Sequence, residues 1–165
     1  MRRFLVFPLA TLSIVGALGA TCGPDSGIPE TETNCEAGSA NSEQVQLGRI
    51  VSERFEPFGS EVSLPLEFGS QGGQHVTVSV RYYSQDGAEW LHELLLTAEN
   101  GSRVGGRTYV GERCTTGWTR IDNLAVFVDD QTLARAQLSI ASGPYDPNLG
   151  TAVRVITSSA TLRIQ

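Results

Sequence analysis

The chain has 165 residues, 40% of them apolar, which is enough to close one hydrophobic core of ordinary domain size. Its 12 Arg and 18 Asp and Glu give a formal net charge of −6, and such a surface repels phosphate backbones, so we predict no binding of nucleic acid. The sequence contains no lysine, which excludes Schiff-base chemistry, a P-loop lysine and a Ser-Lys dyad.

Residues 1–21 have the pattern of a secretory signal peptide. The first three residues, MRR, are positively charged, and the apolar run FLVFPLATLSIVGALGA follows and ends in small residues. A retained single-span anchor is the alternative, but proline, glycine and hydroxyl residues interrupt the run, and its length is at the lower limit for spanning a bilayer. Removal of the segment would leave 10 Arg against 18 acids, a net charge of −8.

The sequence LGATC, which ends at Cys22, resembles the signal of bacterial lipoproteins, in which a leucine and small residues precede the cysteine that is lipidated. The resemblance implies lipidation at Cys22, a membrane as partner through the lipid anchor, and, from Gly23, sorting to the outer membrane. Leu18 lies one position further upstream of the cysteine than the leucine of the lipoprotein pattern, and Thr21 is an uncommon residue immediately before the cleavage site. A cut after Gly19, which would give a soluble secreted protein, therefore stays open as the alternative.

The three cysteines provide a separate indication. An unpaired thiol can be oxidised or form unwanted disulfides in an oxidising compartment. Lipidation of Cys22 would leave two cysteines, Cys35 and Cys114, which can pair with each other. We therefore predict a Cys35–Cys114 disulfide, with two unpaired thiols as the alternative. Residues 22–44 are rich in proline, glycine and acids and have almost no large apolar side chain, which predicts an acidic flexible tether with Cys35 pinned to the folded domain.

Residues 45–165 show short apolar runs separated by Gly, Asn, Asp and Pro, typical of a β domain. In residues 60–68, Val62, Leu64, Leu66 and Phe68 alternate with polar positions and are expected on one face, and residues 74–83 alternate in the same way. The further expected strands are Gln46 to Phe55, Trp90 to Thr97, Arg107 to Glu112, Asn123 to Asp129, Arg135 to Ala141 and Ala152 to Ile164.

This number and spacing of strands predicts an all-β fold, an antiparallel β-sandwich of immunoglobulin-like type, with a small β-barrel as the alternative. The segment WLHELLLTAE allows a short helix as well, but its leucine-rich middle suits a strand buried on both faces. The segment FGSQGGQHV at residues 68–76 resembles a GxQGGxHV-like stretch in a group of uncharacterised bacterial lipoproteins. That resemblance implies an envelope location and a sandwich fold, and it implies no activity.

The two histidines are the main candidates for chemistry. His75 follows Gly72-Gly73, where it either begins a strand or ligates a metal, and His92 lies among apolar residues in WLHELLL. If both met across a sheet with a carboxylate such as Glu93 or Glu112, they would form a copper or zinc site. The simpler interpretation is a strand start for His75 and a hydrogen-bonded core residue for His92.

The sequence has no nucleophile elbow and no calcium-loop spacing, and its paired acids, Asp129-Asp130 and those of DGAE at 86–89, are typical of solvent-facing turns. We therefore predict that the protein is not an enzyme and has no cofactor. The loop GPYDPNLG at 143–150 holds Tyr145 between prolines, and Tyr145 is therefore a candidate binding residue. We predict a non-catalytic lipoprotein of the cell envelope, a binding or structural module whose partner is an envelope protein or a glycan. The alternatives are a periplasmic metal-binding protein that uses His75 and His92, and a small hydrolase or carbohydrate-binding domain.

Overall fold

The computed structural model describes residues 31–69, 73–130 and 132–165, and the described chain is built from strands. The signal segment and Cys22 lie outside the described residues. The twelve strands are β1 Glu32–Glu36, β2 Gln44–Val51, β3 Arg54–Pro57, β4 Glu61–Leu64, β5 Glu67–Phe68, β6 Gln74–Tyr83, β7 Glu89–Thr97, β8 Arg103–Glu112, β9 Trp118–Val128, β10 Arg135–Asp146, β11 Thr151–Ala152 and β12 Ile156–Ile164. The predicted all-β fold is confirmed.

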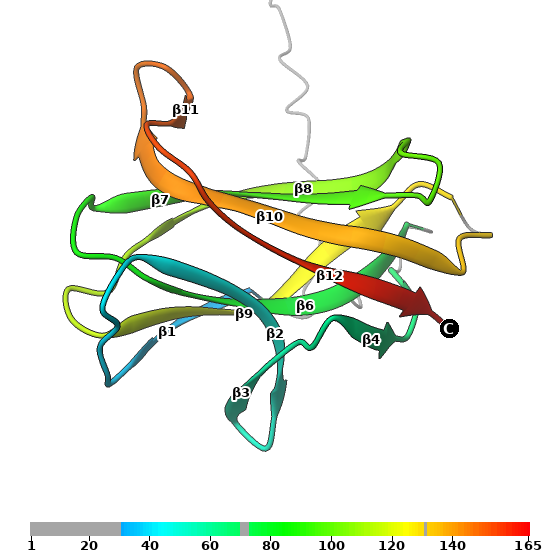
Figure 1. Cartoon of the computed structure of the whole chain (residues 1–165), viewed down its shortest axis with the longest axis horizontal. Helices are drawn as coiled ribbons and strands as arrows, with labels where there is room; N and C mark the ends of the chain where they lie inside the picture. Colours follow the sequence, from blue (N-terminus) through cyan, green and yellow to red (C-terminus); the bar gives the residue numbers. More distant parts are fainter. Residues whose placement is uncertain (1–30, 70–72, 131) are drawn as a thin grey trace, which may run out of the picture.

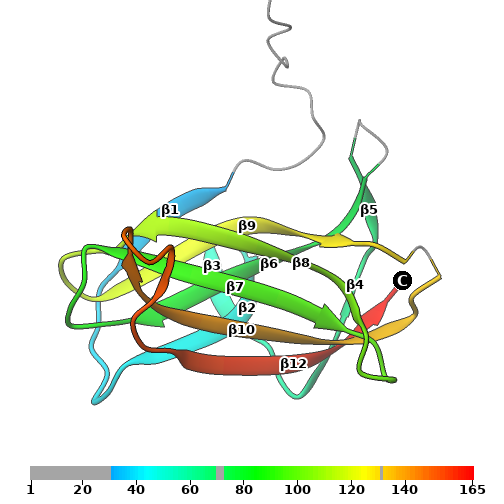
Figure 2. The ribbon, with the colours of Figure 1, turned by 90° about the horizontal axis from the view of Figure 1, so that it is seen from above.

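The strands follow one hydrogen-bonded path, in the order β3-β2-β6-β9-β8-β7-β10-β12-β4, with β1 on β9, β5 on β6 and β11 on β10. This sheet curls over itself into two layers, an upper one with β7, β8 and β10 and a lower one with β1, β6 and β9 (Figure 1). Seen from above, the long strands of both layers run in similar directions, as in aligned sandwiches (Figure 2). All pairs are antiparallel except β4 with β12, which is parallel.

The sheet passes from one layer to the other at two glycines of β8. Gly105 pairs with Val128 and Gly106 with Phe127, and this short ladder is the whole pairing between β8 and β9. A Cβ atom on Gly105 would stand 2.0 Å from the carbonyl oxygen of Phe127. Glycine is therefore required at residue 105 so that the two backbones can approach where the layers join.

Gly105→Ala is expected to lower the free energy of unfolding by roughly 1–3 kcal/mol, because the added methyl group forces the backbones of β8 and β9 apart. Urea titration followed by near-UV circular dichroism measures this change. Gly59→Ala is the matched control, since a Cβ atom there meets nothing within 4 Å. Equal urea midpoints for the two variants would show that the backbones of β8 and β9 can move apart at Gly105 without loss of stability.

The core between the layers follows from the period of two in the strands. In β6 the side chains of Val76, Val78, Val80 and Tyr82 are buried, and they pack in one cluster with inward side chains of the other layer. β7 contributes Trp90, Leu94 and Leu96, and β10 contributes Leu138 and Ile140. Burial of this apolar surface is the main force that holds the layers together.

Several strand predictions were wrong in detail. The single strand expected from Gln46 to Phe55 is a hairpin of β2 and β3, whose turn residues Ser52 and Glu53 have φ of 48° and 66°. Phe68, expected on the inner face, is 66% exposed, because Pro65 separates β4 from β5 and β5 pairs with the end of β6. The expected loop at 143–150 begins inside β10, which continues to Asp146.

The segment predicted as a tether, residues 22–44, contains a strand. Glu32–Glu36 forms β1 and pairs with Trp118–Asp122 of β9 over five residues, so this part of the acidic segment belongs to the folded domain. The segment has no apolar alternation of its own, and the ladder to β9 determines its conformation. In the described residues no helix reaches the length and apolar character needed to cross a membrane.

Candidate functional site

His75 is fully buried on the outer side of the lower layer, where its strand neighbours are Glu67 of β5 and Phe127 of β9. Its Nε2 lies 3.1 Å from Oε2 of Glu67, but neither ring nitrogen has a hydrogen-bond partner among the described residues. The same carboxylate oxygen accepts a hydrogen bond of 2.7 Å from the hydroxyl of Thr77. His75 therefore begins a strand as the simpler interpretation predicted, and it is not exposed to a partner.

His92 is fully buried on the inner face of the upper layer. Its Nδ1 lies 2.8 Å from Oγ of Ser142, and its ring is 4.7 Å from that of Tyr82 and 6.3 Å from that of Tyr109. Burial lowers the pKa of His92 to about 3, and the same effect raises the pKa of Tyr82 to about 12. Both side chains are therefore neutral at physiological pH, as core residues.

The structure does not bring the two histidines together. His75 lies on the outer side of β6, in the lower layer, and His92 on the inner face of β7, in the upper layer. Glu93 and Glu112 are exposed on the opposite side of the upper sheet from His92. Within the described ranges no three His, Cys, Asp or Glu side chains are grouped so as to hold a metal ion. The alternative in which both histidines meet across a sheet is not formed, and both residues follow the simpler interpretation.

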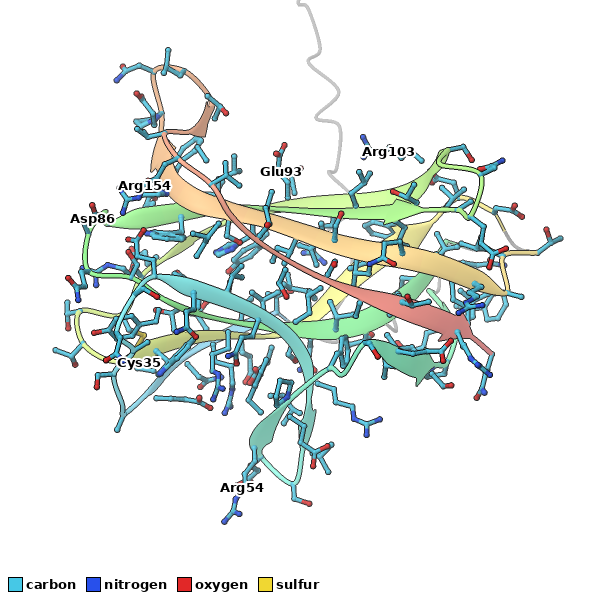
Figure 3. The ribbon with its side chains drawn as sticks, in the orientation of Figure 1. Cys35, Arg54, Asp86, Glu93, Arg103 and Arg154 are labelled. Atoms are coloured by element: carbon cyan, nitrogen blue, oxygen red, sulfur yellow. A yellow bond between two sulfur atoms is a disulfide. The ribbon has the colours of Figure 1, made fainter. Side chains whose placement is uncertain are left out.

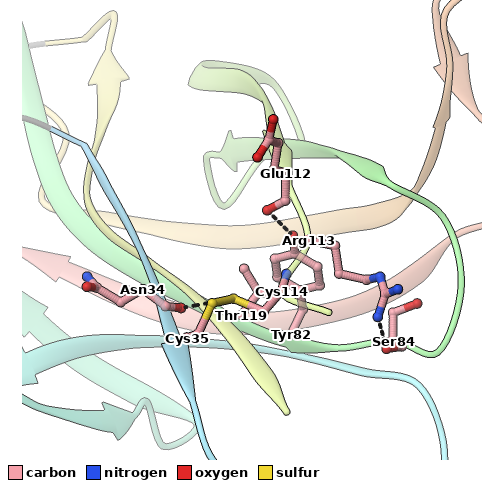
Figure 4. Close-up of a disulfide and its surroundings, with 8 residues drawn as sticks. All are labelled: Asn34, Cys35, Tyr82, Ser84, Glu112, Arg113, Cys114 and Thr119. Carbon is pink, nitrogen blue, oxygen red and sulfur yellow. Dashed lines mark hydrogen bonds between the residues drawn. A yellow bond between two sulfur atoms is a disulfide. The ribbon is translucent and has the colours of Figure 1, made fainter. Parts of the chain in front are cut away.

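The predicted disulfide between Cys35 and Cys114 is formed, with the two Cα atoms 5.8 Å apart. It joins β1 to the loop that follows β8 (Figure 4). The backbone N–H of Cys114 donates to Oγ1 of Thr119 at 2.8 Å, and Sγ of Cys114 lies against the carbonyl of Asn34. The loop that carries Cys114 is thereby fixed to β9, and β1 is covalently attached to it.

A charged cluster attaches β1 to the outer side of the lower layer. Glu36 of β1 forms ion pairs with Arg120 at 2.5 Å and with Arg81 at 3.5 Å, and Arg120 also contacts Asp122 at 2.8 Å. The guanidinium of Arg81 lies between two rings, 4.7 Å from the ring centroids of Phe55 and Trp118. These contacts pair the charges of the cluster with one another within the sheet, and we interpret them as structural.

The aromatic side chains divide into core and surface. Tyr82 and Trp90 are fully buried and stack with their rings 5.1 Å apart, whereas Tyr83 and Trp118 contact each other on the outer side of the lower layer. Tyr145 is half-buried in β10 and pairs with Ala152 of β11. Tyr145 is therefore held by a strand pair and is not at the tip of the loop.

The outer side of the upper layer carries exposed acids and apolar side chains that sequence analysis missed. Along β7, Glu89, Glu93 and Leu95 are exposed, and β8 adds Val110 and Glu112. Figure 3 shows Glu93 directed away from the core on this side. We call these five residues the acidic sheet face. An open cleft of about 700 Å³, lined in part by Glu89 and Glu112, lies at one end of it.

The alternation of Glu89, Leu91, Glu93 and Leu95 was the signal for this face in the sequence. We expected this strand to be buried on both sides because its middle is rich in leucine. Leu91 is indeed buried, at 6% exposure, but Leu95 is 36% exposed and both acids face solvent. The expectation of a strand was correct, and the burial of both faces was wrong.

Comparison with known proteins assigns no family to this chain. No family model matches the chain, and no curated protein matches it. Among solved structures, the N-terminal domain of PorA matches with 10% sequence identity and a TM-score of 0.34, over 74% of this chain and 98% of that domain.

Proposed function

We propose that the protein is an exported, lipid-anchored, non-catalytic binding or structural module of the cell envelope, held at the outer membrane. One observation supports the anchor most directly: Cys35 and Cys114 are joined to each other, so Cys22 is the odd cysteine of the three. A cysteine at the end of an apolar signal segment, with no intramolecular partner left, fits lipidation.

The surface supports a role in recognition. Leu95 and Val110 are 36% and 39% exposed and lie between carboxylates on a continuous sheet. Such side chains project from rigid strands, so they present a fixed arrangement of charge and apolar surface to a partner. The buried His75 and His92 take no part in this surface.

The intact mass of the protein extracted from its native membranes tests the anchor. We expect a chain that begins at Cys22 with added acyl mass, and two further thiols that react with an alkylating reagent only after reduction. A chain without acyl mass that begins near Ala20 would overturn the anchor and make this a soluble secreted protein. Thiols that react before reduction would contradict the disulfide independently of the anchor.

A further inference from the structure

The pairing of β7 with β8 arranges the acidic sheet face in rows. Glu89 pairs with Glu112, and Leu91 with Val110 in the next outward row. The rows after these pair Glu93 with Thr108 and Leu95 with Gly106. Because residues of one parity share a side of the sheet, acidic and apolar positions alternate along β7, where Leu91 is buried and Leu95 is exposed, and β8 adds Glu112 and Val110. The face thus has a repeating pattern of charge and apolar contact.

The carboxylates of this face have no ion-pair partner within the described residues. Glu89, Glu93 and Glu112 make no salt bridge, although most other acids of the described domain pair with an arginine; the paired acids are Glu36, Glu43, Glu56, Glu61, Glu99, Asp86 and Asp122. The adjacent Arg113 uses its guanidinium on the backbone carbonyls of Gly87 and Ser84, at 2.8 and 3.0 Å.

The pair Glu89 and Glu112 is unfavourable in the isolated molecule. Like charges directly opposite each other on neighbouring antiparallel strands repel, and neither carboxylate forms an ion pair among the described residues, although the Arg113 guanidinium lines the same cleft. A partner that supplies positive charge would remove this repulsion on binding. The local arrangement therefore suits a complex better than it suits the free protein.

We propose that the acidic sheet face is the docking surface for a protein partner whose own surface carries Arg or Lys between apolar side chains. This proposal rests on the proposed function and specifies its partner class. Charge complementarity selects this occupant, because a second copy of the same face or an anionic membrane would place negative charge against Glu89, Glu93 and Glu112. The apolar rows supply the desolvated contacts that charges alone do not give.

The surroundings of the face fit a partner that lies across the strands. The β10 side chains next to β7 on this side, Ser139 and Ala141, are small, so they do not project above the side chains of β7. At one end the segment around β11 rises above the upper layer (Figure 1), and it exposes Val153 and Val155 at 67% and 53%. This segment offers further apolar contact at the border of the face.

The test uses a fluorescent 12-residue peptide of alternating Arg and Val as the probe and the purified mature protein as the receptor, measured by anisotropy at low ionic strength. The variant Glu89→Gln/Glu93→Gln/Glu112→Gln is expected to bind roughly tenfold more weakly, from the loss of three exposed ion pairs. The control Glu32→Gln/Glu53→Gln/Asp129→Asn changes the net charge equally and removes other unpaired acids, so we expect less than a twofold change there.

Two further measurements separate the contributions. Leu95→Ser/Val110→Ser is expected to weaken binding several-fold without changing its salt dependence, and raising the salt concentration is expected to weaken the native protein more than the triple Gln variant. The Gln variant has lost a like-charge pair, so its thermal midpoint is expected to be unchanged or higher. Circular dichroism therefore distinguishes lost binding from lost structure.

Equal weakening in the face variant and its control would overturn the proposal, since only the net charge would then matter. Binding of anionic phosphatidylglycerol vesicles, or self-association in sedimentation, that depends on the same three glutamates would also overturn it in favour of another occupant. A lipidated Cys22 together with failed peptide binding would refute the docking surface alone. An unlipidated chain that binds the peptide would refute the anchor alone.

Discussion

Replacing Cys35 and Cys114 by serine is expected to lower the free energy of unfolding by about 4 kcal/mol, the largest effect of any change outside the apolar core. The disulfide joins residues 79 apart in the sequence, so its loss returns the freedom of a long loop to the unfolded chain. In the folded protein β1 would keep its five-residue ladder on β9, the ion pairs of Glu36 and the hydrogen bond that Asn34 donates to Asp122.

Urea titration measures this difference, and both proteins should carry Cys22→Ser so that neither an acyl chain nor a third thiol contributes. With a urea dependence of 1–3 kcal/mol per molar, typical of small domains, we expect the midpoint to fall by roughly 2 M. Hydrogen exchange of the β1 amides can reveal the result that would contradict this prediction. If only these amides exchange faster while the midpoint stays, then β1 detaches locally and the disulfide does not stabilise the whole domain.

The sequence was sufficient for the strands whose apolar side chains alternate strictly. β6 was predicted with its bounds and its inward face, because every second residue from Val76 to Tyr82 is apolar and buried. The hairpin at Ser52 and Glu53 was not predictable, because its turn lacks the Asn or Gly that commonly adopts positive φ. β1 was not predictable either, because non-local contacts, the ladder on β9 and the disulfide, determine its conformation.

The candidate surface was only partly readable. The alternation of Glu89 and Glu93 with leucines indicates an exposed side of a strand, but the residues of this segment are also compatible with a helix. That Glu112 lies opposite Glu89 is a matter of strand register, which the sequence of either strand alone does not fix. The acidic sheet face can therefore be identified only from the structure, which gives the register of β7 against β8.

Lowering the pH from 7.5 to 5 is expected to destabilise the native protein by roughly 2 kcal/mol more than His92→Gln, because the variant lacks the buried imidazole of His92. In the unfolded chain His92 takes up its proton near its ordinary pKa of 6.5, whereas burial lowers the pKa in the fold to about 3. Between these values the unfolded chain binds one proton more. The stability contribution of the neutral ring is therefore complete above pH 6.5 and is lost as the pH falls toward 3.

The physical reason lies in the contacts of the ring. Nδ1 of His92 has Ser142 as its partner, but Nε2 has none within the described residues, so the second N–H of an imidazolium would have no acceptor. Urea titrations at both pH values measure the effect, and Leu94→Ala is the control, since it removes a neighbouring buried side chain and keeps His92. That control should retain the full pH dependence. The same pH dependence in His92→Gln would mean that the folded protein protonates His92 as readily as the unfolded chain, and the buried neutral imidazole would then have to be abandoned.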